Sequence, residues 1–237
     1  MRKGKKMLWI ITGVVTALIA VSFGVYKWMN ARSFQAAGDI VTHAETDSKE
    51  VALTFDDGPT EYTQEILDML DELDVKGTFF LIGEAMESHT EEAKAIVDAG
   101  HQVGSHAYSH QRMVFRSGQF IADELDKTND LLRQAGYEGE IMFRPPYGKK
   151  LVLLPLALQE RGMTTVMWSR EPEYEGDLSG TAESIADNVV QMVQPGDIIA
   201  MHLMYDSSAP SREAVPLIVE RLRDEGYSFV TVSELLD

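Results

Sequence analysis

Length, composition and charge restrict what this chain can be. Its 237 residues suffice for one large domain or two small ones, and 44% hydrophobic residues allow a sizeable core. Cysteine is absent, which excludes a disulfide framework, a thiol nucleophile, a zinc–thiolate site and a lipid-modified cysteine. The formal net charge is −17, so the chain should repel nucleic acid, and we expect no nucleic-acid partner.

Residues 1–30 have the composition of a basic tip followed by a membrane anchor. No charged residue occurs from Met7 to Tyr26, and at about 1.5 Å per residue a helix of this length spans the roughly 30 Å of a bilayer core. The aromatic residues Trp9, Tyr26 and Trp28 stand near the two expected interfaces. Four basic residues before the span and two after it favour a cytoplasmic N-terminus. We therefore expect membrane contact through residues 7–28, a single pass through the cell membrane and an extracellular remainder.

A cleaved signal peptide is the alternative, and the chain would then be secreted. Such a peptide usually has an apolar core of about 7–15 residues and a cleavage site of small residues. The apolar core here is longer, and "ARSFQAAGD" at 31–39 is a poor cleavage site. The uncleaved anchor is therefore favoured.

After the anchor, the chain divides into a linker and one domain. Residues 31–49 are polar and aperiodic and predict a linker. Residues 50–237 alternate short apolar runs with amphipathic stretches, such as the helices expected at 61–73 and 118–135. The predicted strands are 51–55, 78–82, 102–105, 141–143, 164–168, 198–201 and 229–232. This alternation predicts an α/β fold with a parallel sheet, either a small barrel or an open doubly wound sheet.

Ionisable residues follow these strands where the strands end. They are Asp56 and Asp57, His106 and His110, Arg144 and Tyr147, Arg170, Glu171 and Glu173, and His202. In a parallel barrel the carboxyl ends of the strands carry the active site, so we expect these side chains to meet.

His106 and His110 are spaced so that a helix would present both on one face, able to share one ion. With one aspartate they make three protein ligands, which suits zinc or another first-row divalent metal and leaves a position for water. Each motif alone has a plainer interpretation. The segment "DDGP" is typical of a turn, "RPPYG" of a rigid turn, and His202 of a core histidine. Their order and common placement favour a site.

Three of these motifs resemble those of the polysaccharide deacetylases, carbohydrate esterase family four, which share the NodB homology domain. The resemblance covers about residues 50–235 and rests on "TFDDG" (54–58), "SHAYSH" (105–110) and "RPPY" (144–147). It implies a distorted (β/α) barrel of seven or eight parallel strands behind the N-terminal transmembrane helix. It also implies a metal-dependent hydrolase that removes acetyl groups from N-acetylglucosamine-type sugars of a cell-wall or extracellular polysaccharide and releases acetate.

The same resemblance implies the central roles. Asp57, His106 and His110 would hold a divalent metal, zinc in the first place and otherwise cobalt or manganese. Asp56 would be the general base, and His202 would protonate the leaving amine. Two other readings stay open at this point: ester hydrolysis of the acetylxylan esterase type, and an inactive, membrane-tethered glycan-binding module. No protein partner can be inferred.

The resemblance also implies a supporting set of residues. Arg144 would pair with Asp56, and the backbone N–H of Tyr147 would stabilise the tetrahedral oxyanion. Glu171, where the family usually has Asp, would orient His202 or Arg144. Pro146, Tyr147 and Trp168 would contact substrate. A second departure, Ala200 in place of a usual Leu, would widen the acetyl pocket.

Overall fold

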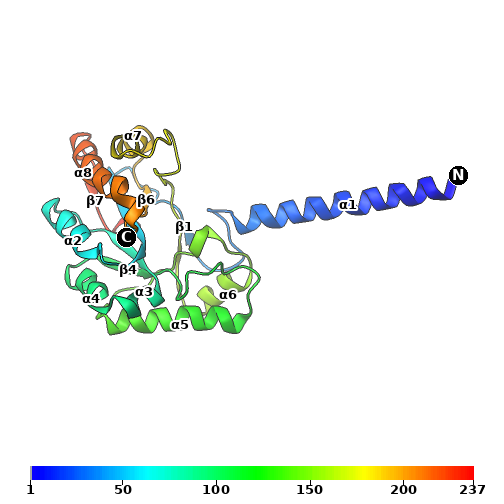
Figure 1. Ribbon diagram of the computed structural model, residues 1–237, viewed down its shortest axis with the longest axis horizontal. Helices are drawn as coiled ribbons and strands as arrows, with labels where there is room; N and C mark the ends of the chain where they lie inside the picture. Colours follow the sequence, from blue (N-terminus) through cyan, green and yellow to red (C-terminus); the bar gives the residue numbers. More distant parts are fainter. Residues whose placement is uncertain (1) are drawn as a thin grey trace.

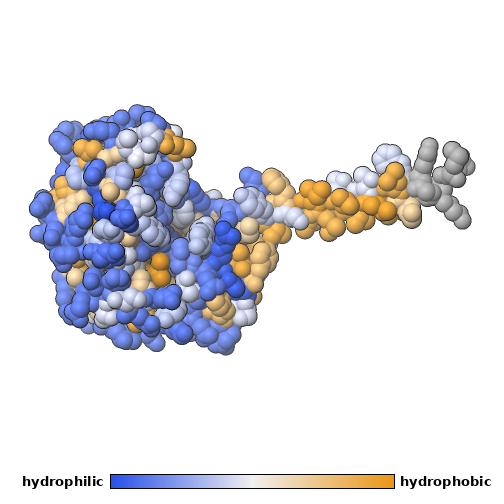
Figure 2. Space-filling view, in the orientation of Figure 1, coloured by the Kyte–Doolittle hydropathy of each residue, from blue (hydrophilic) through white to orange (hydrophobic). Residues whose placement is uncertain are grey.

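The computed structural model describes residues 2–237, and for residues 2–6 it describes the backbone alone. The side chains of the predicted basic tip therefore lie outside the described residues. Helix α1 (Arg2–Met29) projects away from the rest of the molecule (Figure 1). Its segment Met7–Met29 is long and apolar enough to cross a membrane, and none of its apolar window is buried against the domain. Figure 2 shows this helix as the largest apolar surface in that view. The prediction of one long apolar N-terminal helix is confirmed.

A parallel sheet forms the centre of the domain. Its central strand β2 (Glu50–Gly58) lies between β3 (Thr78–Leu81) and β6 (Ile198–Met201), and β4 (Gln102–Ser105) pairs with β3. At the start of β2, β7 (Ser228–Phe229) adds a short parallel pairing. All of these pairings are parallel, as the β/α alternation predicts.

Single β-bridges extend the sheet into a distorted barrel. Phe143 bridges Ser105 on one side and Thr165 on the other, which connects β4 to β5 (Thr165–Val166). Arg170, a few residues beyond β5, bridges Ile199 of β6. The strands thus lead from β6 through β2, β3 and β4 back to β6, and the predicted distorted barrel is confirmed.

Side chains that alternate along β2 belong to two different apolar clusters, one on each side of the strand. Val51, Leu53 and Phe55 belong to a large apolar cluster with residues of the surrounding helices, whereas Ala52 belongs to a smaller inner cluster. The helices that cover the outside are α2 (Thr63–Glu72), α3 (Gly83–Ser88), α4 (Thr90–Asp98), α5 (Gly118–Gln134), α6 (Leu153–Glu160), α7 (Ala182–Met192) and α8 (Ala209–Asp224) (Figure 1). Because side chains alternate along a strand, Thr54 and Asp56 share the inner side with Ala52.

Three predicted elements differ in the structure. The segment 141–143 contributes only the bridge at Phe143, and the segment 229–232 divides into β7 and helix α9 (Val232–Leu236). Thr231 caps α9 in a capping box with Glu234, a start signal that overrides the β-branched run before it. The predicted linker at 31–49 contains a two-residue strand, β1 (Ile40–Val41), which pairs with β5. A strand this short has no periodicity by which the sequence could reveal it.

Candidate active site

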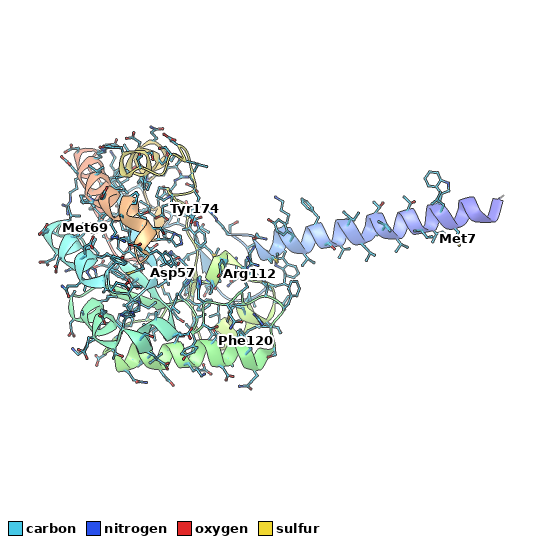
Figure 3. The ribbon with its side chains drawn as sticks, viewed as in Figure 1. Met7, Asp57, Met69, Arg112, Phe120 and Tyr174 are labelled. Carbon is cyan, nitrogen blue, oxygen red and sulfur yellow. The ribbon has the colours of Figure 1, made fainter. Side chains whose placement is uncertain are left out.

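The predicted site residues gather around one cavity of about 870 Å³ at the carboxyl ends of the strands. Figure 3 places Asp57 inside the domain, well away from Met7 on the distal part of α1. The predicted residues that line the cavity are Asp56, Asp57, His106, His110, Tyr147, Trp168, Glu171 and His202. Arg144 is fully buried behind it. Pro146 is also buried, and its neighbour Pro145 lines the cavity instead.

The backbone at the end of β2 explains how two adjacent carboxylates reach this cavity together. Strand alternation would send Asp56 and Asp57 to opposite faces of the sheet. Instead, the pairing with β3 shifts register between Asp56 and Gly58, and Asp57 adopts a left-handed conformation with φ of 71°. Such bulges re-aim side chains, and aspartate tolerates positive φ better than most residues. Asp57 is thereby turned toward the same cavity as Asp56.

Asp57, His106 and His110 form a cluster with the geometry of a metal site. One ligand atom from each residue lies within 4.8 Å of the others. Asp57 Oδ1 is 3.4 Å from Nε2 of His106 and 3.1 Å from Nε2 of His110. That oxygen is buried and has no hydrogen-bond partner among the described residues. A buried carboxylate oxygen facing two imidazole nitrogens is the donor set expected of a divalent-metal site.

Surrounding groups set the orientation and the protonation state of these candidate ligands. His106 Nδ1 lies 2.7 Å from the carbonyl oxygen of Arg144 and therefore donates to it, which leaves Nε2 free to act as a ligand. Burial on its own would raise the pKa of Asp57, but contact with His106 and the charges of His106, His110 and His202 hold it far below its usual value. Burial, followed by the charge of His106, lowers the pKa of His110. Asp57 ionised and His110 neutral are the protonation states in which these groups bind metal.

Asp56 lies beside this cluster but is held by a different group. Arg144 Nη1 donates to Asp56 Oδ1 at 2.7 Å and to the hydroxyl of Thr54 at 2.7 Å. The remaining guanidinium nitrogens donate to the carbonyl oxygens of Val166 and Met167. A buried arginine satisfied in this way fixes the carboxylate of Asp56 as an acceptor. The expected Asp56–Arg144 pair is therefore present in the structure.

His202 is paired with Glu173, one of the strand-end residues expected at the site but without a predicted role of its own. Its Nδ1 lies 2.7 Å from Oε2 of Glu173, and the same carboxylate accepts the backbone N–H of His202. Burial alone would lower the pKa of His202, but the hydrogen bond with Glu173 and nearby carboxylates raise it to about 9. Glu173, and not Glu171, is thus placed to orient this histidine.

Glu171 lies elsewhere on the cavity wall. It accepts from the indole Nε1 of Trp168 at 2.8 Å and from Nη2 of Arg32 at 3.0 Å. Burial raises the pKa of Glu171. Ala200, which was expected to widen the acetyl pocket, belongs to the inner cluster and is not among the residues that line the cavity.

Two tyrosines, Tyr147 and Tyr205, also line the cavity. Tyr147 has φ of 59°, its side chain is exposed, and its ring centroid lies 4.8 Å from that of His110. Within residues 2–237 its backbone N–H has no hydrogen-bond acceptor, so it is free to donate. The hydroxyl of Tyr205 donates to Asp57 Oδ2 at 2.8 Å. No sequence motif indicates Tyr205, because a loop after β6 brings it to Asp57.

Comparison with known proteins gives one consistent family. A sequence model described as polysaccharide deacetylase matches residues 43–166. The chain is 33% identical over 218 residues to a peptidoglycan-N-acetylglucosamine deacetylase of Bacillus cereus, covering 90% of this chain and 76% of the relative. A solved structure of a peptidoglycan N-acetylglucosamine deacetylase superposes with a TM-score of 0.76 at 34% identity, covering 82% of this chain and 91% of that one.

Another relative is much longer than the chain. A bifunctional xylanase/deacetylase of Pseudobutyrivibrio xylanivorans is 33% identical over 192 residues, which is 81% of this chain but only 31% of the relative. The chain thus spans about a third of that protein, and the similarity is confined to that third.

Proposed function

Because the chain belongs to the polysaccharide deacetylase family, we propose that it hydrolyses the acetamide of N-acetylglucosamine-type residues in a cell-wall polysaccharide and releases acetate. One observation carries the proposal. The Asp57–His106–His110 cluster shares a cavity with two separately held proton-transfer groups, Asp56 and His202. A glycan-binding module would need neither the metal ligands nor those two groups.

In this mechanism Asp57, His106 and His110 hold a divalent metal, and their one carboxylate and two imidazoles suit zinc, with cobalt or manganese as alternatives. When bound, such an ion supplies Lewis-acid chemistry: it makes water a stronger acid and polarises a carbonyl group. The orphaned Oδ1 of Asp57 and the free Nε2 of His106 are the ligand atoms that support this assignment.

Asp56 acts as the general base. It accepts a proton from the attacking water, whose oxygen forms a bond to the acetyl carbon. Arg144 holds the carboxylate in place through Oδ1 and is itself fixed by Thr54 and two carbonyl oxygens. The free backbone N–H of Tyr147 donates to the oxyanion that develops on the acetyl oxygen.

His202 acts as the general acid. As the C–N bond breaks, the amine nitrogen of the sugar takes a proton from the His202 ring, and acetic acid and a free amino sugar result. The Glu173 carboxylate on Nδ1 raises the pKa of His202, so the ring is protonated at neutral pH and Nε2 can deliver the proton. Trp168 and Tyr147, both on the cavity wall, would contact the substrate.

We further propose that α1 anchors the chain in the cell membrane, with the N-terminus cytoplasmic and the catalytic domain outside. The length and hydropathy of Met7–Met29 support an anchor, although a signal sequence has similar properties. Fractionation of cells that produce the chain with a C-terminal tag separates the two readings. A membrane-bound product of full mass supports the anchor, and a shortened product in the medium supports cleavage.

Acetate release tests the proposed activity. The purified chain is incubated with peptidoglycan, N-acetylglucosamine oligomers and acetylxylan, before and after treatment with a chelator. We expect acetate from an N-acetylated glycan, its loss on chelation, and its return on adding zinc. Release from acetylxylan alone would identify an esterase, and no release from any glycan with metal present would support the inactive binding module.

A further inference from the structure

The segment between α1 and the domain is docked against the residues that follow "RPPYG". The backbone N–H of Lys150 donates to the carbonyl oxygen of Met29 at 3.1 Å, and its Nζ donates to the carbonyl oxygen of Ala31. Lys149 Nζ donates to Oδ1 of Asn30 at 2.7 Å. Two lysines at the C-terminal end of a helix also interact favourably with its dipole. The juxtamembrane segment, residues 30–32, is therefore attached to the domain by specific contacts.

This segment reaches the candidate active site. Asn30 and Arg32 both line the cavity that contains the Asp–His–His cluster. Arg32 Nη2 lies 3.0 Å from Oε2 of Glu171, and its Nη1 lies 3.7 Å from Oε1 of Glu175. The guanidinium carbon also stands 4.8 Å from the ring centroid of Trp168. One arginine thus bridges two carboxylates and covers an aromatic ring of the cavity wall.

Arg32, Trp168 and Glu171 form a closed triangle, because the indole of Trp168 donates to the carboxylate oxygen that Arg32 contacts. Trp168 is 9% exposed and the Glu171 side chain 15% exposed, so both are largely shielded from water. Without Arg32, Glu171 would keep a single hydrogen bond among the described residues, and a shielded carboxylate without a counter-charge is costly. Both side chains would then move toward solvent.

We propose that Arg32 is a positioning residue of the active site. It holds Glu171 and the ring of Trp168 in place, so that the wall of the substrate cavity is complete only when the juxtamembrane segment is docked. The statement about substrate rests on the proposed function. The statement about the position of Trp168 does not depend on it.

Steady-state kinetics of the full-length chain test the role in substrate binding. The variants are Arg32→Ala and Arg32→Lys, and the control is Arg161→Ala, which removes an arginine–carboxylate pair with Asp126 remote from the cavity. In Arg32→Ala we expect KM for an N-acetylglucosamine oligomer to rise about fivefold while kcat changes less than about twofold, since the wall binds substrate and does not transfer protons. Arg32→Lys keeps the charge but not the planar fork and should recover part of the loss.

A fluorescence measurement tests the position of Trp168 without any activity. In a Trp9→Phe/Trp28→Phe background, Trp168 is the one tryptophan left, because the chain has three. Arg32→Ala should increase acrylamide quenching of this residue about twofold, as expected for a shielded ring that gains solvent contact, and Arg161→Ala should leave it unchanged. Equal circular dichroism spectra and melting temperatures establish that the variants are folded.

Unchanged quenching and unchanged KM in a folded Arg32→Ala variant would overturn the proposal, as would equal changes in Arg161→Ala. If the wild-type chain released no acetate from any glycan, the proposed function would fail, while increased quenching in Arg32→Ala would still support the positioning role.

Discussion

Glu173 holds His202 at two places at once. Its Oε2 lies 2.7 Å from Nδ1 of the imidazole, and its carboxylate oxygens lie 3.1 and 3.2 Å from the backbone nitrogen of the same residue. This double contact fixes both the ring and the chain that carries it. Burial alone would lower the pKa of His202, but the Glu173 hydrogen bond, with the charges of Asp56, Glu173 and Asp57, raises it to about 9.

The first prediction is that Glu173→Gln moves the alkaline limit of activity downward. The proposed general acid must be protonated, so kcat/KM of the wild-type chain should fall as pH rises through about 9. Without the Glu173 charge, the charges of Asp56 and Asp57 alone oppose the effect of burial on the pKa of His202, so the fall should begin at a lower pH. A pH–rate profile of both proteins measures this. Glu183→Gln, which removes a surface pair with Arg221, is the control, and a profile for Glu173→Gln that coincides with wild type would contradict the assignment.

The Glu173–His202 pair should also contribute to the free energy of unfolding. Because the folded-state pKa of His202 is raised from 6.5 to about 9, its contribution is fully present below pH 6.5 and is lost as pH rises through 9. The free energy of unfolding of metal-free protein should therefore differ between wild type and Glu173→Gln more at pH 6 than at pH 10. Urea titrations at the two pH values measure the difference, and equal differences would show that the pair does not stabilise the fold.

A second prediction concerns the hydroxyl of Tyr205, which donates to Oδ2 of the proposed metal ligand Asp57. Burial, followed by the Asp57 charge, raises the pKa of Tyr205, so the hydroxyl remains a donor. Hydrogen bonds of this kind typically contribute about 10-fold in metal affinity, and Tyr205→Phe should weaken zinc binding by about that factor. Competition with a chelator measures the affinity. Tyr62→Phe removes a surface hydroxyl bonded to Asp206 and should bind zinc as wild type does; equal weakening in both variants would argue against a specific role for Tyr205.

The third prediction tests the packing beneath the site. A Cβ added at Gly104 in β4 would lie 2.7 Å from Phe80 Cε1 and 2.9 Å from the carbonyl oxygen of Met142. Gly104→Ala should therefore lower the free energy of unfolding by about 1–3 kcal/mol. Gly118 begins α5, and apart from its chain neighbours and the local helix backbone no described residue lies within 4 Å of an added Cβ, so Gly118→Ala should be neutral or slightly stabilising. Denaturant titration compares the two, and a neutral Gly104→Ala would mean that this contact relaxes without cost.

Sequence patterns predict the parts of the site that follow directly from strand ends. Asp57, His106 and His202 could be placed together because the carboxyl ends of parallel strands meet at one edge. The choice between Glu171 and Glu173 could not be made, since both follow β5 and the path of the irregular chain decides which carboxylate faces His202. Arg32 and Tyr205 carry no such signal, because contacts made by a loop and by the residues just after α1 leave no periodic pattern in the sequence.

The fold, too, could be predicted from the sequence only where an element has a strong local pattern. The long buried strand β2 begins with a continuous apolar run, and helix α5 has an amphipathic periodicity, so both were predicted to within a few residues. Phe143 joins the barrel through single bridges, and β1 has two residues, so tertiary pairing defines them rather than local preference. The bulge at Asp57 is of the same kind: "DDG" indicates a turn, but only the pairing with β3 shows that the turn brings both carboxylates to one cavity.

The division of roles between the two adjacent aspartates is the central claim, and metal content measured together with turnover tests it most directly. Asp57→Ala and Asp56→Asn are purified with zinc, metal per chain is measured by elemental analysis, and kcat is measured by acetate release. Asp57→Ala should lose both metal and activity, whereas Asp56→Asn should retain about one ion per chain and lose about 10²–10⁴-fold in kcat. Full activity in Asp56→Asn, or full metal content in Asp57→Ala, would contradict the account.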